Sequence, residues 1–82
     1  MKDQARAYFK YNYQHNKTRS RYVANYFDFI TFCREKFNCK TKNECENYVQ
    51  NYEEFLEGKG YTPSTIHNKL APICIYHCIK MS

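Results

Sequence analysis

The sequence predicts an all-α domain, on three observations. Apolar residues recur at steps of three and four along most of the chain, which is the spacing of one helix face. Only two glycines and two prolines interrupt that pattern. No run of alternating apolar and polar residues is bounded by turn residues, as a strand would require.

The first predicted helix covers residues 3–14, and the second begins after Thr18. The hydroxyl of Thr18 is the expected N-cap, because it can accept a hydrogen bond from a free backbone amide. The second helix carries a broad apolar arc from Tyr22 to Phe37. Its opposite face is polar and includes Arg21 and Asn25.

A capping box predicts the start of the third helix. Thr41 and Glu44 have the T-x-x-E spacing in which hydroxyl and carboxylate each satisfy a backbone amide. Apolar residues then follow at steps of three and four as far as Leu56. Gly60 stands where a C′ glycine belongs, so we expect one helix that ends near residue 58 or 59.

The fourth predicted helix begins with Thr62 as N-cap and Pro63 at the first helical position, where a missing amide costs nothing. Pro72 lies inside this helix and removes one backbone hydrogen bond, so we expect a kink or a short break near residues 68–71. The inner face is expected to hold Ile66, Leu70, Ile73, Cys74 and His77.

The length of 82 residues allows one hydrophobic core, so residues 1–82 are expected to form a single domain. No apolar run approaches the roughly 18 residues that a membrane helix needs. The N-terminus is charged and aromatic and has no apolar leader, and the five cysteines are an odd number. A reducing cytoplasm is the expected location.

The net charge of +5 is concentrated at the N-terminal end. Residues 1–21 contain six basic residues and one acid, whereas residues 22–59 contain seven acids and five bases. A local positive field favours a polyanionic partner such as nucleic acid, although a solvated face that keeps the protein soluble has the same composition.

Candidate phosphate ligands gather near two predicted helix N-termini, whose free amides and positive dipole end attract anions. Capping alone explains Thr18 and Thr62, and a solvated face would explain the polar residues opposite Ile66. The candidate DNA-binding residues are Lys17, Thr18, Arg19, Arg21 and Asn25 on the second helix and Thr62, Ser64, Thr65, Asn68 and Lys69 on the fourth.

No catalytic motif is present, and we expect neither cofactor nor metal. Cys33, Cys39 and Cys45 follow a C-x5-C-x5-C spacing that matches none of the usual structural zinc patterns. Cys74 and Cys78, with His77 between them, could bind a metal, but small apolar core residues are the simpler interpretation.

Four segments resemble the core-binding domain of tyrosine recombinases, the phage-integrase family. Residues 17–22 (KTRSRY), followed by Phe29 and Phe32, are similar to the K-T-x-x-x-Y…F-x-x-F pattern of its second helix. Residues 52–56 (YEEFL), 60–66 (GYTPSTI) and 68–71 (NKLA) continue the resemblance in the same order, and the block beginning GYTPSTI is the most specific.

The resemblance implies a compact four-helix SAM-like orthogonal bundle that grips double-stranded DNA at a recombination site during DNA integration and recombination by a mobile element. The second and fourth helices would face the DNA. The family's catalytic residues belong to a separate C-terminal domain, so this chain is expected to be inert by itself. That catalytic domain and neighbouring recombinase protomers are the other implied partners.

A small helical protein-interaction module remains the alternative function, because fold alone does not decide function. It predicts binding that changes little with salt. Ile75 and Ile79 fall one turn apart on the predicted outer face of the last helix, and we expect them, with Tyr76, to contact the catalytic domain or a protomer. If Pro72 rotates this turn, they would enter the core instead.

Overall fold

The computed structural model describes residues 2–79, and every regular element in this range is an α-helix. The all-α prediction is therefore confirmed, but the expected count of four helices is wrong. The five helices are α1 (Lys2–Asn12), α2 (Asn16–Phe37), α3 (Lys42–Glu46), α4 (Val49–Gly58) and α5 (Pro63–Tyr76).

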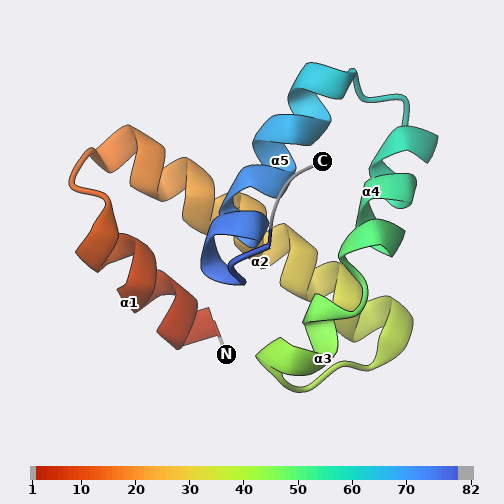
Figure 1. Ribbon diagram of the computed structural model, residues 1–82, viewed down its shortest axis with the longest axis horizontal. Coiled ribbons are helices and arrows are strands. Elements are labelled where there is room, and N and C mark those ends of the chain that lie inside the picture. Colours follow the sequence, from red (N-terminus) through yellow and green to blue (C-terminus); the bar gives the residue numbers. More distant parts are fainter. Residues whose placement is uncertain (1, 80–82) are drawn as a thin grey trace.

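The long helix α2 is the centre of the arrangement (Figure 1). It packs against α5 on one side and against α1 at its N-terminal end, while α4 packs against α5. One hydrophobic cluster receives side chains from all five helices. Its largest fully buried side chains are Tyr26, Phe9, Phe29, Ile30 and Ile73. No helix in the described range is long and apolar enough to span a membrane.

Helix α2 begins two residues before the predicted N-cap, so the N-cap assignment of Thr18 is wrong. The N-cap is His15, which makes no capping hydrogen bond with its side chain. The first turn is instead closed by Arg19, whose backbone N–H donates to the His15 carbonyl and whose Nη2 donates to Asn16 Oδ1 at 2.6 Å. Thr18 consequently lies inside the helix.

The capping box is confirmed, but the single helix that was expected to follow it is divided. Glu44 N donates to Thr41 Oγ1 at 3.2 Å. After Glu46 the backbone makes tighter bonds, with Tyr48 N donating to the Cys45 carbonyl, and Tyr48 leaves the helical region at φ −114°. The ring of Tyr48 stacks on Phe37 with centroids 4.0 Å apart, a contact with α2 that fixes this turn.

Helix α5 starts as predicted and continues through Pro72 without a break, so the expected break is wrong. Thr65 N donates to Thr62 Oγ1, and Pro63 occupies the first turn. A proline at position 72 leaves the carbonyl of residue 68 without its usual donor. Asn25 of α2 supplies a replacement, because its Nδ2 donates to the Asn68 carbonyl at 3.5 Å. The predicted inner face is buried throughout.

Helix α5 ends at Tyr76 in a Schellman turn, in which Ile79 N donates to the Cys74 carbonyl and Cys78 N donates to the Ile75 carbonyl. Cys78 takes the left-handed conformation at φ 56°. Ile79 therefore lies beyond the helix, and the prediction that Ile75 and Ile79 lie one helical turn apart is wrong.

Candidate nucleic-acid interface

A polar stripe runs along the first half of α2. Lys17, Arg21 and Asn25 are four residues apart, so they share one face of the helix. Lys17 and Arg21 are exposed, and Asn25 is half-buried because its amide bonds to α5. Asp28, one turn further on, ends the positive part of the stripe.

The N-terminal half of α5 adjoins this stripe. The backbone carbonyl of Asn68 accepts the hydrogen bond from Asn25 of the stripe. Lys69 lines a surface hollow together with Asp28. Ser64 and Asn68 are exposed. The ammonium of Lys69 lies over the ring of Tyr61, 5.2 Å from its centroid. Five of the predicted residues thus form one continuous surface: Lys17, Arg21, Asn25, Asn68 and Lys69.

The remaining predicted residues have other surroundings. Thr62 and Thr65 use their hydroxyls on each other and on the helix cap, with Thr62 Oγ1 donating to Thr65 Oγ1 at 3.1 Å. Arg19 is two residues from Arg21 and therefore points to a different side of α2. A helix beginning after Thr18 would have placed both Arg19 and Arg21 in its first turn, but α2 starts at Asn16, so Arg21 lies in the second turn.

A second basic surface lies between α1 and α2, and sequence analysis did not single it out. Arg19 lines a hollow of about 470 Å³ together with Arg6 and Lys10 of α1. Lys2 and Arg6 both lie over the ring of Phe27, about 5 Å from its centroid. The four-residue spacing of Lys2, Arg6 and Lys10 could have indicated this surface.

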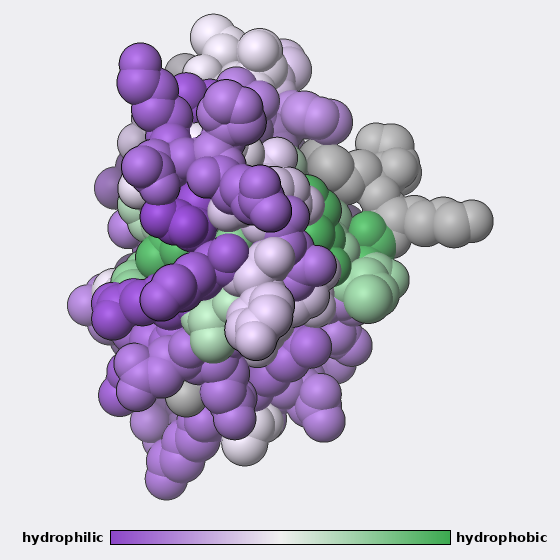
Figure 2. Space-filling model, turned by 90° about the vertical axis from the view of Figure 1, so that its left-hand side faces the viewer, coloured by the Kyte–Doolittle hydropathy of each residue, from purple (hydrophilic) through white to green (hydrophobic). Residues whose placement is uncertain are grey.

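Figure 2 shows the side of the molecule formed by α1 and the start of α2. Hydrophilic side chains cover most of this face, and hydrophobic surface is confined to small areas between them. The hollow beside Arg19 has apolar walls of this kind, formed by Val23, Ala24 and Phe27. The basic residues therefore surround a small apolar floor.

A chain of hydrogen bonds links Glu46 of α3, through the buried ring of His77, to Tyr26 of α2. His77 Nδ1 lies 3.1 Å from Glu46 Oε1, and His77 Nε2 lies 2.7 Å from the Tyr26 hydroxyl. Since the carboxylate can only accept from Nδ1–H, the neutral ring accepts at Nε2 from the Tyr26 O–H. These two hydrogen bonds connect α3, α2 and the C-terminal end of α5. Tyr26 is completely buried, so its hydroxyl is closed to a substrate.

The hydrogen-bond chain predicts a loss of stability in acid. Burial lowers the pKa of His77 below its ordinary value of 6.5, with Lys42 acting in the same direction and Glu46 opposing both. The unfolded chain therefore binds the proton more readily, and the free energy of unfolding should fall by up to about 1.4 kcal/mol per pH unit below pH ~6.5. Urea unfolding across this range measures the effect.

An exposed histidine, His67, supplies the control for this prediction. His67→Gln should keep the acid sensitivity of the parent, because His67 is exposed. His77 itself should titrate below pH 6.5 when its ring protons are followed by NMR. Titration above that value would contradict the prediction.

The alternative metal site at Cys74, His77 and Cys78 is not formed, because both ring nitrogens of His77 are occupied by Glu46 and Tyr26. Cys74 is buried and Cys78 is exposed. By contrast, the structure brings Cys33, Cys39 and Cys45 together.

The contact surface expected from Ile75, Tyr76 and Ile79 differs from the prediction. Tyr76 is directed into the aromatic cluster, with its ring centroid 5.0 Å from that of Tyr8 and 5.1 Å from that of Tyr26. Ile75 packs partly against the core. Together with Ile79 it also lines a shallow hollow of about 320 Å³ whose other walls are Ala71, Cys74 and Cys78.

Comparisons with known proteins find no matching family model, no curated relative and no solved structure similar to this chain.

Proposed function

We propose that the chain is a DNA-binding module of the core-binding type found in tyrosine recombinases, with the SAM-like fold of that family. The observation that carries the proposal is the position of the basic excess: six cations against one acid in residues 1–21. These residues belong to α1, the turn after it and the beginning of α2. Lys17 and Arg21 lie on the surface shared by α2 and α5, whereas Arg6, Lys10 and Arg19 line the hollow between α1 and α2.

The surface shared by α2 and α5 is the proposed DNA contact. Exposed Lys17 and Arg21 offer cations to phosphate oxygens, and exposed Asn68 offers a hydrogen bond next to Asn25. Exposed Ser64 lies one helical turn before Asn68 on α5. The bond from Asn25 to the Asn68 carbonyl keeps the two helices in register at this surface. Asn25 therefore acts mainly by holding α5 in place.

Removal of two cations from this surface should weaken DNA binding. Binding of a fluorescent duplex is measured by anisotropy at several salt concentrations. The change of Lys17 and Arg21 together to alanine should lower affinity at low salt by roughly tenfold or more, and reduce the slope of log K against log salt by about two, because two phosphate contacts are lost.

Two further double variants locate the contact. Lys36→Ala with Lys40→Ala removes the same charge at the C-terminal end of α2 and in the loop that follows it, and should change affinity much less. Arg6→Ala with Lys10→Ala tests the basic surface between α1 and α2. A large loss only in this last variant would move the contact to that surface. No binding by the parent chain at low salt would refute the DNA-binding function.

A protein-interaction module is the second candidate, and the hollow lined by Ile75 and Ile79 favours it. In the recombinase proposal this hollow faces the catalytic domain or a neighbouring protomer. The two functions differ in their response to salt, because DNA binding depends steeply on salt and an apolar contact does not.

A further inference from the structure

Three of the five cysteines converge at the corner between α2 and α3. Cys33 belongs to the last turns of α2, Cys39 to the connecting loop and Cys45 to α3. Their sulfur atoms all lie within 4.8 Å of one another. All three side chains are buried, and Cys39 is the most accessible at 3%. None of the three forms a disulfide in the structure.

The backbone that presents these sulfurs is held by contacts of its own. Asn38 ends α2 in the left-handed conformation, at φ 54°. Cys39 N then donates to the Cys33 carbonyl at 3.3 Å, which turns the loop back toward α2. The capping box of Thr41 and Glu44 fixes the start of α3. The three thiols are thus positioned before any ligand arrives.

We propose that this cluster is a metal site that binds one monovalent copper ion through the thiolates of Cys33, Cys39 and Cys45. Thiolates are soft ligands that select copper(I) or zinc over harder cations. With a metal–sulfur distance of about 2.3 Å, three sulfurs in a trigonal plane around the ion are about 4 Å apart. The three sulfurs all lie within 4.8 Å of one another, so any adjustment needed to reach that separation is less than about 1 Å for each pair that is too far apart.

The number of ligands favours copper(I) over zinc. Structural zinc is almost always bound by four ligands. Within residues 2–79, the group contains only the three cysteines and no fourth histidine, cysteine or carboxylate. The burial of all three side chains leaves little room for a water ligand. Copper(I) is satisfied by three sulfur atoms, so the site is complete for that ion.

Charge balance requires that three thiol protons leave to solvent as the ion enters, and the resulting complex carries two negative charges. Metal binding at cysteine is commonly coupled to proton release in this way.

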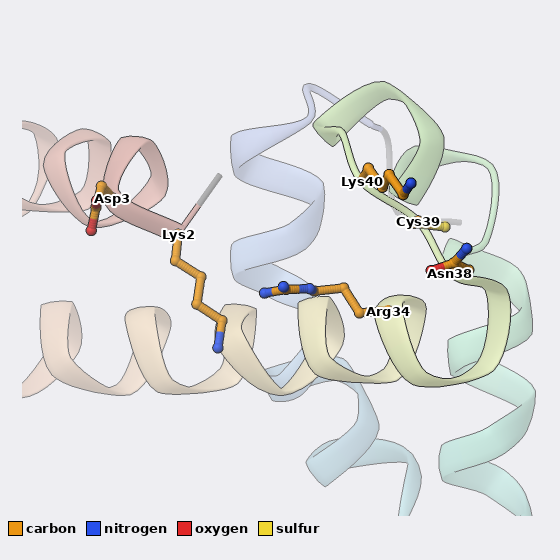
Figure 3. A pocket seen from close by; sticks show the side chains of 6 residues that line it. All are labelled: Lys2, Asp3, Arg34, Asn38, Cys39 and Lys40. Carbon is orange, nitrogen blue, oxygen red and sulfur yellow. The ribbon is translucent and has the colours of Figure 1, made fainter.

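A basic pocket beside Cys39 supplies compensating charge. This open pocket of about 530 Å³ is lined by Lys2, Asp3, Arg34, Asn38, Cys39 and Lys40. Figure 3 shows Arg34 and Lys40 on the two sides of the space in front of the loop, with the sulfur of Cys39 turned away from Arg34. The cations that line the pocket lie next to the Cys39 loop and offset the charge of the negative complex.

The experiment uses the reduced 82-residue chain under anaerobic conditions, titrated with copper(I) held by the chelator bathocuproine disulfonate. The chain should remove a single copper ion from the chelator, and X-ray absorption should show three sulfur neighbours. Loading should also raise the melting temperature, because the folded state holds the three thiols together and therefore binds the ion more tightly than the unfolded chain does. No copper uptake, or a coordination shell containing oxygen or nitrogen, would overturn the proposal.

Cysteine variants locate the ion. Cys39→Ser should abolish copper uptake with the helical circular dichroism unchanged, since Cys39 lies in a loop. Cys74→Ser is the matched control, because Cys74 is also buried but lies outside the cluster, and it should bind like the parent. Equal loss in both variants would overturn the assignment. So would tighter binding of zinc than of copper(I) by the parent chain.

Discussion

Replacement of Phe9 by alanine should lower the free energy of unfolding by about 3–5 kcal/mol, because a fully buried ring is lost and a cavity remains. Phe9 is 0% exposed and is the main side chain by which α1 reaches the core. Its centroid lies between 5.3 and 6.2 Å from the rings of Tyr8, Tyr13, Tyr22, Tyr26 and Tyr76.

The expected loss approaches the entire stability of a domain of this size, so much of the Phe9→Ala variant should be unfolded. Urea unfolding followed by far-ultraviolet circular dichroism measures the difference. Tyr11→Ala is the control, because Tyr11 lies on the same helix but is 90% exposed. If Phe9→Ala unfolds at the parent's urea midpoint, α1 does not dock on α2 as described.

The second large loss of stability is expected when His77 is replaced. His77→Ala should lower the free energy of unfolding by about 3 kcal/mol, since the variant loses buried packing and leaves the Tyr26 hydroxyl without its acceptor. Tyr26→Phe removes that hydroxyl. The double variant should therefore be about 1–2 kcal/mol more stable than the sum of the single losses predicts.

Urea unfolding of the parent, the two single variants and the double variant measures this coupling. His67→Ala controls for the loss of an exposed histidine. Strict additivity of the two single changes would show that the 2.7 Å contact between the Tyr26 hydroxyl and His77 Nε2 contributes nothing to stability.

Helix starts and ends that depend on a local hydrogen bond were predictable from the sequence. Thr41 and Thr62 cap as expected, because the hydroxyl and the amide that it bonds are three residues apart. Gly60 adopts the left-handed conformation at φ 85°, as expected of a residue that follows a helix end. The buried face of α5 followed from helical periodicity alone.

Features that depend on contacts between distant segments were decided only by the tertiary structure. Apolar periodicity continues across Tyr48, so the break between α3 and α4 was visible only from its stacking on Phe37. Pro72 is tolerated in α5 because Asn25, 43 residues away from Asn68, donates to the carbonyl of that residue.

The candidate sites also include features that the sequence predicted and features that only the tertiary structure decided. The concentration of positive charge in residues 1–21 is a property of composition and was visible at once. The separation of Arg19 from Arg21 depends on where α2 begins, and that start is set without a side-chain cap. The three-cysteine cluster depends on the fold of the α2–α3 corner, because only a reversal of the chain brings the sulfur atoms of residues six and twelve positions apart to within 4.8 Å of one another.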